Sequence, residues 1–226
     1  MSAIRTASGT AVKEQKLPLS DRIHDEVLEM VIRLSDDGEA DTVFTESALV
    51  EQFSVSKAPV REALVKLCGE GVLRSMPRFG YTIVRLGPKE ARDIMEFRLI
   101  LELGALRRSL PKLPDAALNH VAEHLAASHS RQGQQDVWSI WDDNMEFHCL
   151  LAGLDGNDYI SRALRESMMI QKRIYAQMHW QSQHTLENRL NPIPHERIYQ
   201  AMLRRDVEAA VEALRQDIAE GTQEEK

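Results

Sequence analysis

The feature that most constrains the fold lies between Phe53 and Tyr81, where the sequence reads FSVSKAPVREALVKLCGEGVLRSMPRFGY. Ser56 and Pro59 suit the first turn of a helix, because serine caps free backbone N–H groups and proline has no N–H to leave unpaired. Gly71 suits the end of that helix. Two short extended runs, VLRSM and YTIVRL, follow and are joined by PRFG, a pattern typical of a β-hairpin. The stretch therefore predicts a helix followed by a hairpin.

Two further helices are predicted upstream of this stretch. The segment LSDRIHDEVLEMVIRLS places its apolar residues at helical spacing, and TESALVEQF begins with Thr45 in the capping position. The resulting order of helix, helix, short turn, helix and hairpin is that of a winged helix-turn-helix domain. We expect this domain to occupy residues 17–87, after a flexible tail formed by residues 1–16.

Positive charge is concentrated in the same region. The whole chain has a formal net charge of −7, but residues 54–87 contain six Lys or Arg against two Glu, a net of +4. A local positive field attracts phosphate even in an acidic protein, because charges are screened over about 8 Å at physiological salt. Charge alone leaves two other interpretations open: a solvated helix face, or a basic patch that binds a protein partner.

The placement of the basic residues favours DNA. Lys57 and Arg61 lie in the first turns of the third helix, beside its apolar stripe, and a recognition helix enters the major groove by that end. Arg61 suits bidentate pairing with a guanine edge, whereas Ser56 and Lys57 suit phosphates or bases. Arg78 and Gly80 lie at the hairpin tip, from which the wing reaches the duplex or its minor groove.

The stretch FSVSKAPVREALVKLCGEGVL resembles the signature of the GntR family of bacterial transcription regulators, and the resemblance extends over about residues 18–86. It implies DNA contacts from Ser47, Ser56, Lys57, Arg61, Arg78 and Gly80. The sequence departs from the family pattern at two places. Lys57 stands where arginine is commoner, so a planar bidentate fork is absent there. The segment DDGEADTVFTESAL lacks the usual Pro-Gly before the second helix.

A second domain is predicted to begin after Gly87, at Pro88, and to occupy residues 88–222. Helical patterns fall near residues 88–110, 114–131, 136–154, 157–182, 192–204 and 206–220, with short connections between them. The fold class is therefore mainly α: an N-terminal winged helix-turn-helix followed by an antiparallel bundle of six or seven helices. This second part is similar to the FCD domain of the FadR subfamily, which implies effector binding and dimerisation.

The polar residues of this second domain suggest a ligand site. His148 shares a helix face with Asn144, one turn earlier, although a histidine on an apolar face is more often part of the core. Family members that bind metal have an Asp-x-x-x-His pair on one helix and two histidines on the final helices. By position, the resemblance implies a metal site at Asn144, His148, His195 and Asp217. Two of these depart from the family pattern: Asn144 has an amide in place of a carboxylate, and Asp217 has a carboxylate in place of an imidazole.

This set of donors suits a borderline divalent ion such as zinc, nickel or manganese. Two alternatives remain: the same residues hydrogen-bond an organic ligand directly, or they form a polar core network without metal.

Arg98 lies on or beside the apolar stripe of its helix, where an arginine needs a partner. One interpretation is a clamp for a carboxylate effector, with Asn144, His148 and His195 also lining the site. The other is a structural i,i+4 ion pair with Glu102. His120 and His124, also four residues apart, are interpreted as surface residues.

Sequence signals of enzymes and membrane proteins are absent. There is no GxSxG, P-loop, GxGxxG after a strand or HExxH, which leaves a metal-dependent enzyme using His148, His195 and Asp217 as the alternative function. No signal-peptide pattern or run of eighteen apolar residues occurs. We expect a cytoplasmic, homodimeric transcription regulator, most simply a repressor. It would bind a near-palindromic double-stranded operator and respond to a small organic acid.

Overall fold

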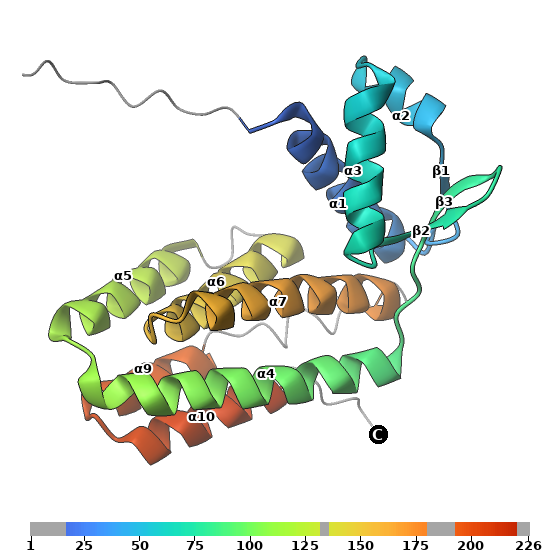
Figure 1. Cartoon of the computed structure of the whole chain (residues 1–226). Helices are drawn as coiled ribbons and strands as arrows, with labels where there is room; N and C mark the ends of the chain where they lie inside the picture. The colour runs from blue at the N-terminus through green and yellow to red at the C-terminus, as the bar shows by residue number, and fades with distance from the viewer. Residues whose placement is uncertain (1–16, 132–135, 180–192, 221–226) are drawn as a thin grey trace, which may run out of the picture. The chain divides into compact units, whose positions relative to one another are not determined.

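The computed structural model of the chain describes residues 17–131, 136–179 and 193–220 (Figure 1). The expected tail at residues 1–16, and the end of the helix predicted at 157–182, lie outside the described residues. Two compact units can be distinguished: one runs to Met30 and from Val43 to Val84, and the other comprises Val31–Thr42 and the chain from Arg85 onward. None of the described helices is both long and apolar enough to cross a lipid bilayer.

The first unit contains the predicted helices. They are α1 (Leu19–Asp36), whose first residues belong to this unit, α2 (Glu46–Phe53) and α3 (Lys57–Gly69). Thr45 caps α2, since its side chain accepts a hydrogen bond from the backbone N–H of Ala48 at 3.2 Å. Ser56 is the N-cap residue of α3, as predicted, but its side chain makes no capping hydrogen bond.

The end of α3 is a helix stop built around Gly71. Its φ of +65° is a left-handed conformation that favours glycine. The N–H of Gly71 bonds to the carbonyl of Cys68, and the N–H of Val72 bonds to the carbonyl of Leu67 at 2.9 Å. This pair of bonds is a Schellman motif, which satisfies helix carbonyls that would otherwise be unpaired. The role predicted for Gly71 is therefore confirmed.

The same device ends α1, where the family's Pro-Gly is absent. Gly38 has a φ of +77°, its N–H bonds to the carbonyl of Ser35, and the N–H of Glu39 bonds to that of Leu34 at 2.7 Å. The segment thus turns without proline, because a single left-handed glycine closes the helix.

The hairpin forms as predicted and joins a third, very short strand. The strands are β1 (Val43–Phe44), β2 (Leu73–Met76) and β3 (Gly80–Ile83), antiparallel in the order β1-β3-β2. Gly80 has a φ of +122°, and a Cβ atom there would lie 2.3 Å from the carbonyl oxygen of Phe44. Gly80 therefore allows β3 to approach β1, a role in the fold that is additional to the one predicted for it.

The core of the first unit is apolar. The stripe predicted on α3 is buried, and it packs with apolar side chains of the other elements. The buried members are Ile23, Val27, Phe44, Leu49, Val60, Ala63, Leu64, Leu67, Val72, Leu73 and Ile83.

The second unit contains six long α-helices among its described residues, close to the predicted spans. They are α4 (Pro88–Ser109), α5 (Asp115–Arg131), α6 (Val137–Gly153), α7 (Asp158–His179), α9 (Ile193–Leu203) and α10 (Val207–Glu220), with a 3-10 turn, η1 (Leu110–Lys112), after α4. α4 packs against α6, α7 and α10, and α9 packs against α5 and α10 (Figure 1). Since α4 contacts three other helices, its inward residues are well placed to build a site.

An apolar cluster joins five of these helices. Its largest members include Leu103, Leu106, Leu118, Leu125, Phe147, Leu151, Ile198, Met202 and Leu214. A smaller cluster on α6 and α7 includes Trp141, Leu164 and Met168. Unlike the first unit, the bundle also buries charged side chains.

Candidate functional site

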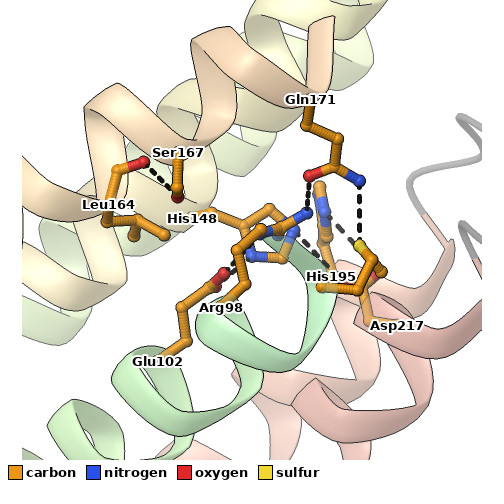
Figure 2. A network of polar contacts seen from close by, with 9 residues as sticks. Arg98, Glu102, His148, Leu164, Ser167, Gln171, His195 and Asp217 are labelled. Carbon is orange, nitrogen blue, oxygen red and sulfur yellow. Dashed lines mark hydrogen bonds and ion pairs between the residues drawn. The ribbon is translucent and has the colours of Figure 1, made fainter. Parts of the chain in front are cut away.

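A connected set of buried polar side chains lies inside the bundle (Figure 2). Its members come from five helices, which brings together residues far apart in the sequence. They are Arg98 and Glu102 on α4, His148 on α6, Gln171 on α7, His195 on α9 and Asp217 on α10. The side chains of Arg98, Glu102 and His148 are only 2–3% exposed.

Arg98 makes the ion pair that the sequence suggested as an alternative. Its Nε donates to Glu102 Oε1 at 2.7 Å, and its Nη1 donates to Gln171 Oε1 at 2.6 Å. Its Nη2 is buried, and in the described part of the chain it has no hydrogen-bond partner. Arg98 therefore has structural partners, and its buried Nη2 is still an unused hydrogen-bond donor.

His148 lies between two carboxylates. Its Nδ1 is 2.6 Å from Glu102 Oε2, and its Nε2 is 3.0 Å from Asp217 Oδ2. Burial alone would lower the pKa of His148, but attraction to Glu102 and the hydrogen bonds to both carboxylates outweigh burial and raise it to about 9. His148 is therefore an imidazolium at neutral pH and donates from both nitrogens.

Glu102 and Asp217 are ionised because each lies beside a positively charged side chain. Burial favours the protonated form of Glu102, but the charges of Arg98 and His148 hold its pKa below the usual range. Burial acts in the same direction on Asp217, and the hydrogen bond and charge of His148 lower its pKa in turn. The cluster is thus a set of alternating charges that stabilise one another in a region with little water.

His195 has a different character from His148. Its ring stacks on Phe147, with centroids 3.9 Å apart, and its Nε2 lies 3.7 Å from Asp217 Oδ1. Burial, with the nearby charge of His148, lowers the pKa of His195 to about 4, although Asp217 opposes this change. Nε2 is buried, and no described residue forms a hydrogen bond with it. His195 is a neutral imidazole with an unused polar atom.

Three of the four predicted metal ligands come together. His148, His195 and Asp217 each offer an atom, and these atoms all lie within 4.8 Å of one another. Asn144 is half-buried, one turn before His148 on α6, and makes none of the contacts that join the other three within the described chain.

The interpretation of His124 as a surface residue is wrong. His120 is exposed, as predicted, with its Nδ1 3.6 Å from Glu123. His124 is half-buried; its Nε2 is covered and lacks a partner among the described residues, and its ring lies 6.1 Å from that of Phe147. The spacing put both histidines on one face, but only the packing of α5 against α6 and α9 decides which of the two is covered.

Sequence reasoning also missed two members of the cluster. Glu102 was considered only as a partner of Arg98, yet it also contacts His148, 46 residues away. No role is predicted for Gln171 from the sequence. It follows Leu164 and Met168 at helical spacing and precedes Ile174, so a polar residue within a buried stripe was the available signal.

Five of the six residues predicted to contact DNA are exposed on the first unit, and the sixth, Gly80, is half-buried. Ser47 lies in the first turn of α2, Ser56 and Lys57 lie at the start of α3, and Arg78 lies between β2 and β3 with a φ of 72°. The side chain of Arg61 is 63% exposed and pairs with Glu46 through two hydrogen bonds of 3.0 and 2.9 Å. This pairing was not predicted.

Comparison with known proteins gives two family matches. Residues 19–83 match the gntR family of bacterial regulatory proteins, and residues 93–220 match the FCD domain. YdhC, an uncharacterised HTH-type transcriptional regulator of Bacillus subtilis, is 27% identical over 169 residues, which cover 73% of each chain. The gluconate operon transcriptional repressor of Bacillus licheniformis is 37% identical over 70 residues, 31% of this chain and 28% of that protein.

An uncharacterised HTH-type regulator of Streptomyces ambofaciens is 31% identical over 93 residues, 41% of this chain and 38% of that protein. The chain thus spans well under two thirds of the length of some relatives that it matches.

Solved structures show the same fold. Escherichia coli McbR has a TM-score of 0.72 at 19% identity, covering 90% of this chain and 95% of that one. Lar, described as controlling the agr system of Listeria monocytogenes, has a TM-score of 0.61 at 18% identity, covering 92% and 96%.

The matched families and relatives are transcriptional regulators, so the alternative of a metal-dependent enzyme is not supported. The FCD match alone covers more than half of the chain. This chain belongs to the GntR family of bacterial transcription regulators, and its C-terminal part is an FCD domain.

Proposed function

We propose that this chain is a ligand-responsive repressor of the FadR subfamily that acts as a homodimer in the cytoplasm. Residues 17–87 would bind double-stranded DNA, and residues 88–222 would bind an effector and dimerise. Two copies related by a two-fold axis would place two α3 helices in successive major grooves of a near-palindromic operator. A small organic acid would shift the equilibrium between arrangements that bind the operator and arrangements that do not.

Exposed groups at the leading end of α3 support the DNA-binding assignment. Ser56 and Lys57 are available to phosphates or base edges, and Arg61 is available to a guanine. Ser47 on α2 and the wing, with Arg78 and Gly80, would add contacts to the sugar-phosphate backbone or the minor groove. We assign the operator contacts to these six residues.

The observation that carries effector binding is the pair of unused polar atoms in the bundle. Arg98 Nη2 and His195 Nε2 are both buried, and neither has a hydrogen-bond partner among the described residues. Leaving such an atom unsatisfied costs about 1–3 kcal/mol. A carboxylate would accept a hydrogen bond from Arg98 Nη2, and the oxygens of a hydroxy or sugar acid would reach toward His195, with Asn144 and His148 also lining the site.

A divalent metal is the second component of the proposal. His148, His195 and Asp217 would hold it, with the Asn144 amide as a further, weaker ligand, and this set of donors suits zinc, nickel or manganese. The neutral His195, with its unused Nε2, fits a metal ligand well. When bound, the ion would supply positive charge that attracts the oxygens of an organic acid. His148 would have to release its proton first, which makes metal binding compete with the ion pairs in the structure.

An exposed apolar face on α4 supports dimerisation. Phe97 and Ile100 are 40% and 70% exposed, and Gly104, one turn further along, is also exposed with nothing within 4 Å of a Cβ placed on it. A second copy would cover these apolar groups. Ile100→Glu should therefore shift the protein toward the monomer in analytical ultracentrifugation, whereas an unchanged dimer would contradict this assignment.

The central experiment is a gel shift with the full chain and DNA flanking its own gene. It should be repeated with panels of sugar acids, hydroxy acids and dicarboxylates. We expect specific binding that weakens steeply with salt, and release by one class of acid. Binding that is equal for unrelated DNA would contradict the function, and indifference to every acid would contradict the effector class.

His148→Ala tests the site itself, with His120→Ala as the control because His120 is an exposed histidine. The His148 variant should bind the operator normally without effector and respond weakly to it, and metal analysis should show less bound zinc, nickel or manganese than in the control. A normal effector response from the His148 variant would show that the site was misassigned.

A further inference from the structure

The ion pair between α2 and α3 has a specific geometry. Arg61 Nε donates to Glu46 Oε1 at 3.0 Å, and Arg61 Nη2 donates to Glu46 Oε2 at 2.9 Å. The carboxylate therefore occupies the side edge of the guanidinium, the edge formed by Nε and Nη2. Glu46 is only 21% exposed, whereas Arg61 is 63% exposed, so the acid is largely covered and the base projects from the surface.

This geometry leaves the other edge of Arg61 available. A guanidinium has N–H donors on Nε, Nη1 and Nη2 in a rigid planar arrangement. The pair with Glu46 uses the Nε–H and one hydrogen of Nη2, so both hydrogens of Nη1 and the second of Nη2 stay free. These form the end-on fork that matches O6 and N7 of guanine in the major groove.

Glu46 is itself held in place. It is the first residue of α2, directly after the Thr45 cap, where the helix dipole favours a carboxylate. The side chain of Tyr81, on β3, lies close enough to the same carboxylate to help lower its pKa. Elements α2, α3 and β3 thus converge on one group, which fixes the carboxylate before any DNA arrives.

We propose that Glu46 is a positioning residue for DNA readout, which orients Arg61 so that its free Nη1/Nη2 edge is presented to a guanine. The inference rests on the proposed function, because it gives Glu46 a role in the recognition assigned to Arg61. A long flexible side chain loses rotamer freedom when it binds, and an arginine that is already oriented avoids much of that loss. The negative charge of Glu46 also disfavours contacts with phosphate, so its effect is to raise sequence discrimination at the expense of total affinity.

The test uses the full chain and a pool of duplexes with a randomised central segment, from which wild type selects its preferred sequence. The measured quantity is the ratio of affinities for the selected duplex and for a scrambled one. Glu46→Gln should bind the scrambled duplex more tightly and lower the ratio about tenfold, the discrimination associated with one bidentate contact. Glu51→Gln is the matched control: it removes the same charge from an exposed site on α2 and should leave the ratio unchanged.

Two further variants keep the test independent of folding. Tyr81→Phe should lower the ratio by a smaller factor, because it removes a hydroxyl that interacts with the Glu46 carboxylate and leaves the ring in place. In an Arg61→Ala background, Glu46→Gln should produce no further fall in the ratio. Circular dichroism and thermal unfolding identify a variant that has lost its fold. If Glu46→Gln does not fold, the ratio measured for Tyr81→Phe decides whether Glu46 has a positioning role.

The possible outcomes separate this inference from the proposed function. If wild type selects no sequence, operator recognition fails and the role of Glu46 fails with it. If wild type selects a sequence and Arg61→Ala does not, but Glu46→Gln keeps the wild-type ratio or raises both affinities equally, only the inference is overturned. Glu46 would then be a repulsive charge without a positioning role.

Discussion

The two units of this chain treat charge in opposite ways. Among the described residues of the first unit, every charged side chain retains contact with solvent, and the core is apolar. The second unit buries charged side chains at its centre, among them Arg98, Glu102 and His148. A unit that meets a large polyanion needs its charges outside, on a rigid support. The small-molecule sensing that we propose for the second unit calls for charges inside, where electrostatic interactions are strong and water is scarce.

The sharpest test of this contrast is Glu102→Ala. It would leave Arg98 and His148 buried without their shared carboxylate, and breaking a buried pair in this way costs about 3–5 kcal/mol. Urea unfolding followed by tryptophan fluorescence measures it, since the sequence has no tryptophan before residue 138 and Trp138 and Trp141 lie on α6 of the second unit.

The control is Glu208→Ala, which breaks an exposed ion pair with Arg107 in the same unit. It should change the free energy of unfolding very little, because exposed pairs contribute little. Equal effects of the two substitutions would mean that burial of the cluster does not govern its energetics.

Arg61→Ala tests the other half of the contrast. We expect specific operator binding at physiological salt to be abolished, because each half-site loses roughly tenfold or more in discrimination. Stability should be unchanged, since the side chain is 63% exposed. Gel shifts paired with thermal unfolding measure both quantities, and retained specific binding would rule out α3 as the recognition helix.

Gly80→Ala tests whether the close approach of β3 to β1 stabilises the sheet of the first unit. The new Cβ would lie 2.3 Å from the Phe44 carbonyl at a φ of +122°, so we expect a loss of about 1–3 kcal/mol. Hydrogen exchange of the β2–β3 amides should report it. Gly69→Ala, which meets nothing within 4 Å in α3, should be neutral or stabilising, and similar behaviour of both variants would contradict the close approach.

The smallest expected effect concerns pH and the surface of the first unit. His24 lies 2.9 Å from Asp25 and 2.7 Å from Glu70. Burial lowers its pKa, but the two carboxylates outweigh burial and raise it above 6.5. The stabilisation, less than about 1 kcal/mol, is thus fully present below pH 6.5 and is lost as pH rises through the raised pKa.

Unfolding of wild type and His24→Asn at pH 6 and pH 8.5 isolates this contribution, because other titrating groups are common to both proteins. The difference in stability between the two proteins should shrink at the higher pH. A constant difference would show that the pair with Glu70 does not form in solution.

Local signals predicted much of the fold. The cap at Thr45, the stop at Gly71 and the start of α4 at Pro88 are backbone requirements that a few neighbouring residues express directly. The site was predicted less completely. His148, His195 and Asp217 were grouped through a family resemblance, because no spacing along the chain relates residues on three different helices.

Glu102 shows why the other contacts of the site could not be predicted from the sequence. Its spacing to Arg98 is a local fact, and their ion pair could be anticipated. Its contact with His148 depends on how α4 packs against α6, and that contact accounts for much of the charge on His148. The same applies to Glu46 and Arg61, whose pairing depends on the angle between α2 and α3.

By itself, the sequence determined the order of the elements, where the helices of the first unit end, and which residues are apolar or charged. These properties depend on backbone geometry and periodicity over a few residues. Only the tertiary structure decided which nitrogen of Arg98 stays unused, that His148 is charged while His195 is neutral, and which edge of Arg61 faces outward. Those outcomes depend on distances of 2.6–3.7 Å between side-chain atoms on different helices, and on the removal of water, which no local stretch of sequence specifies.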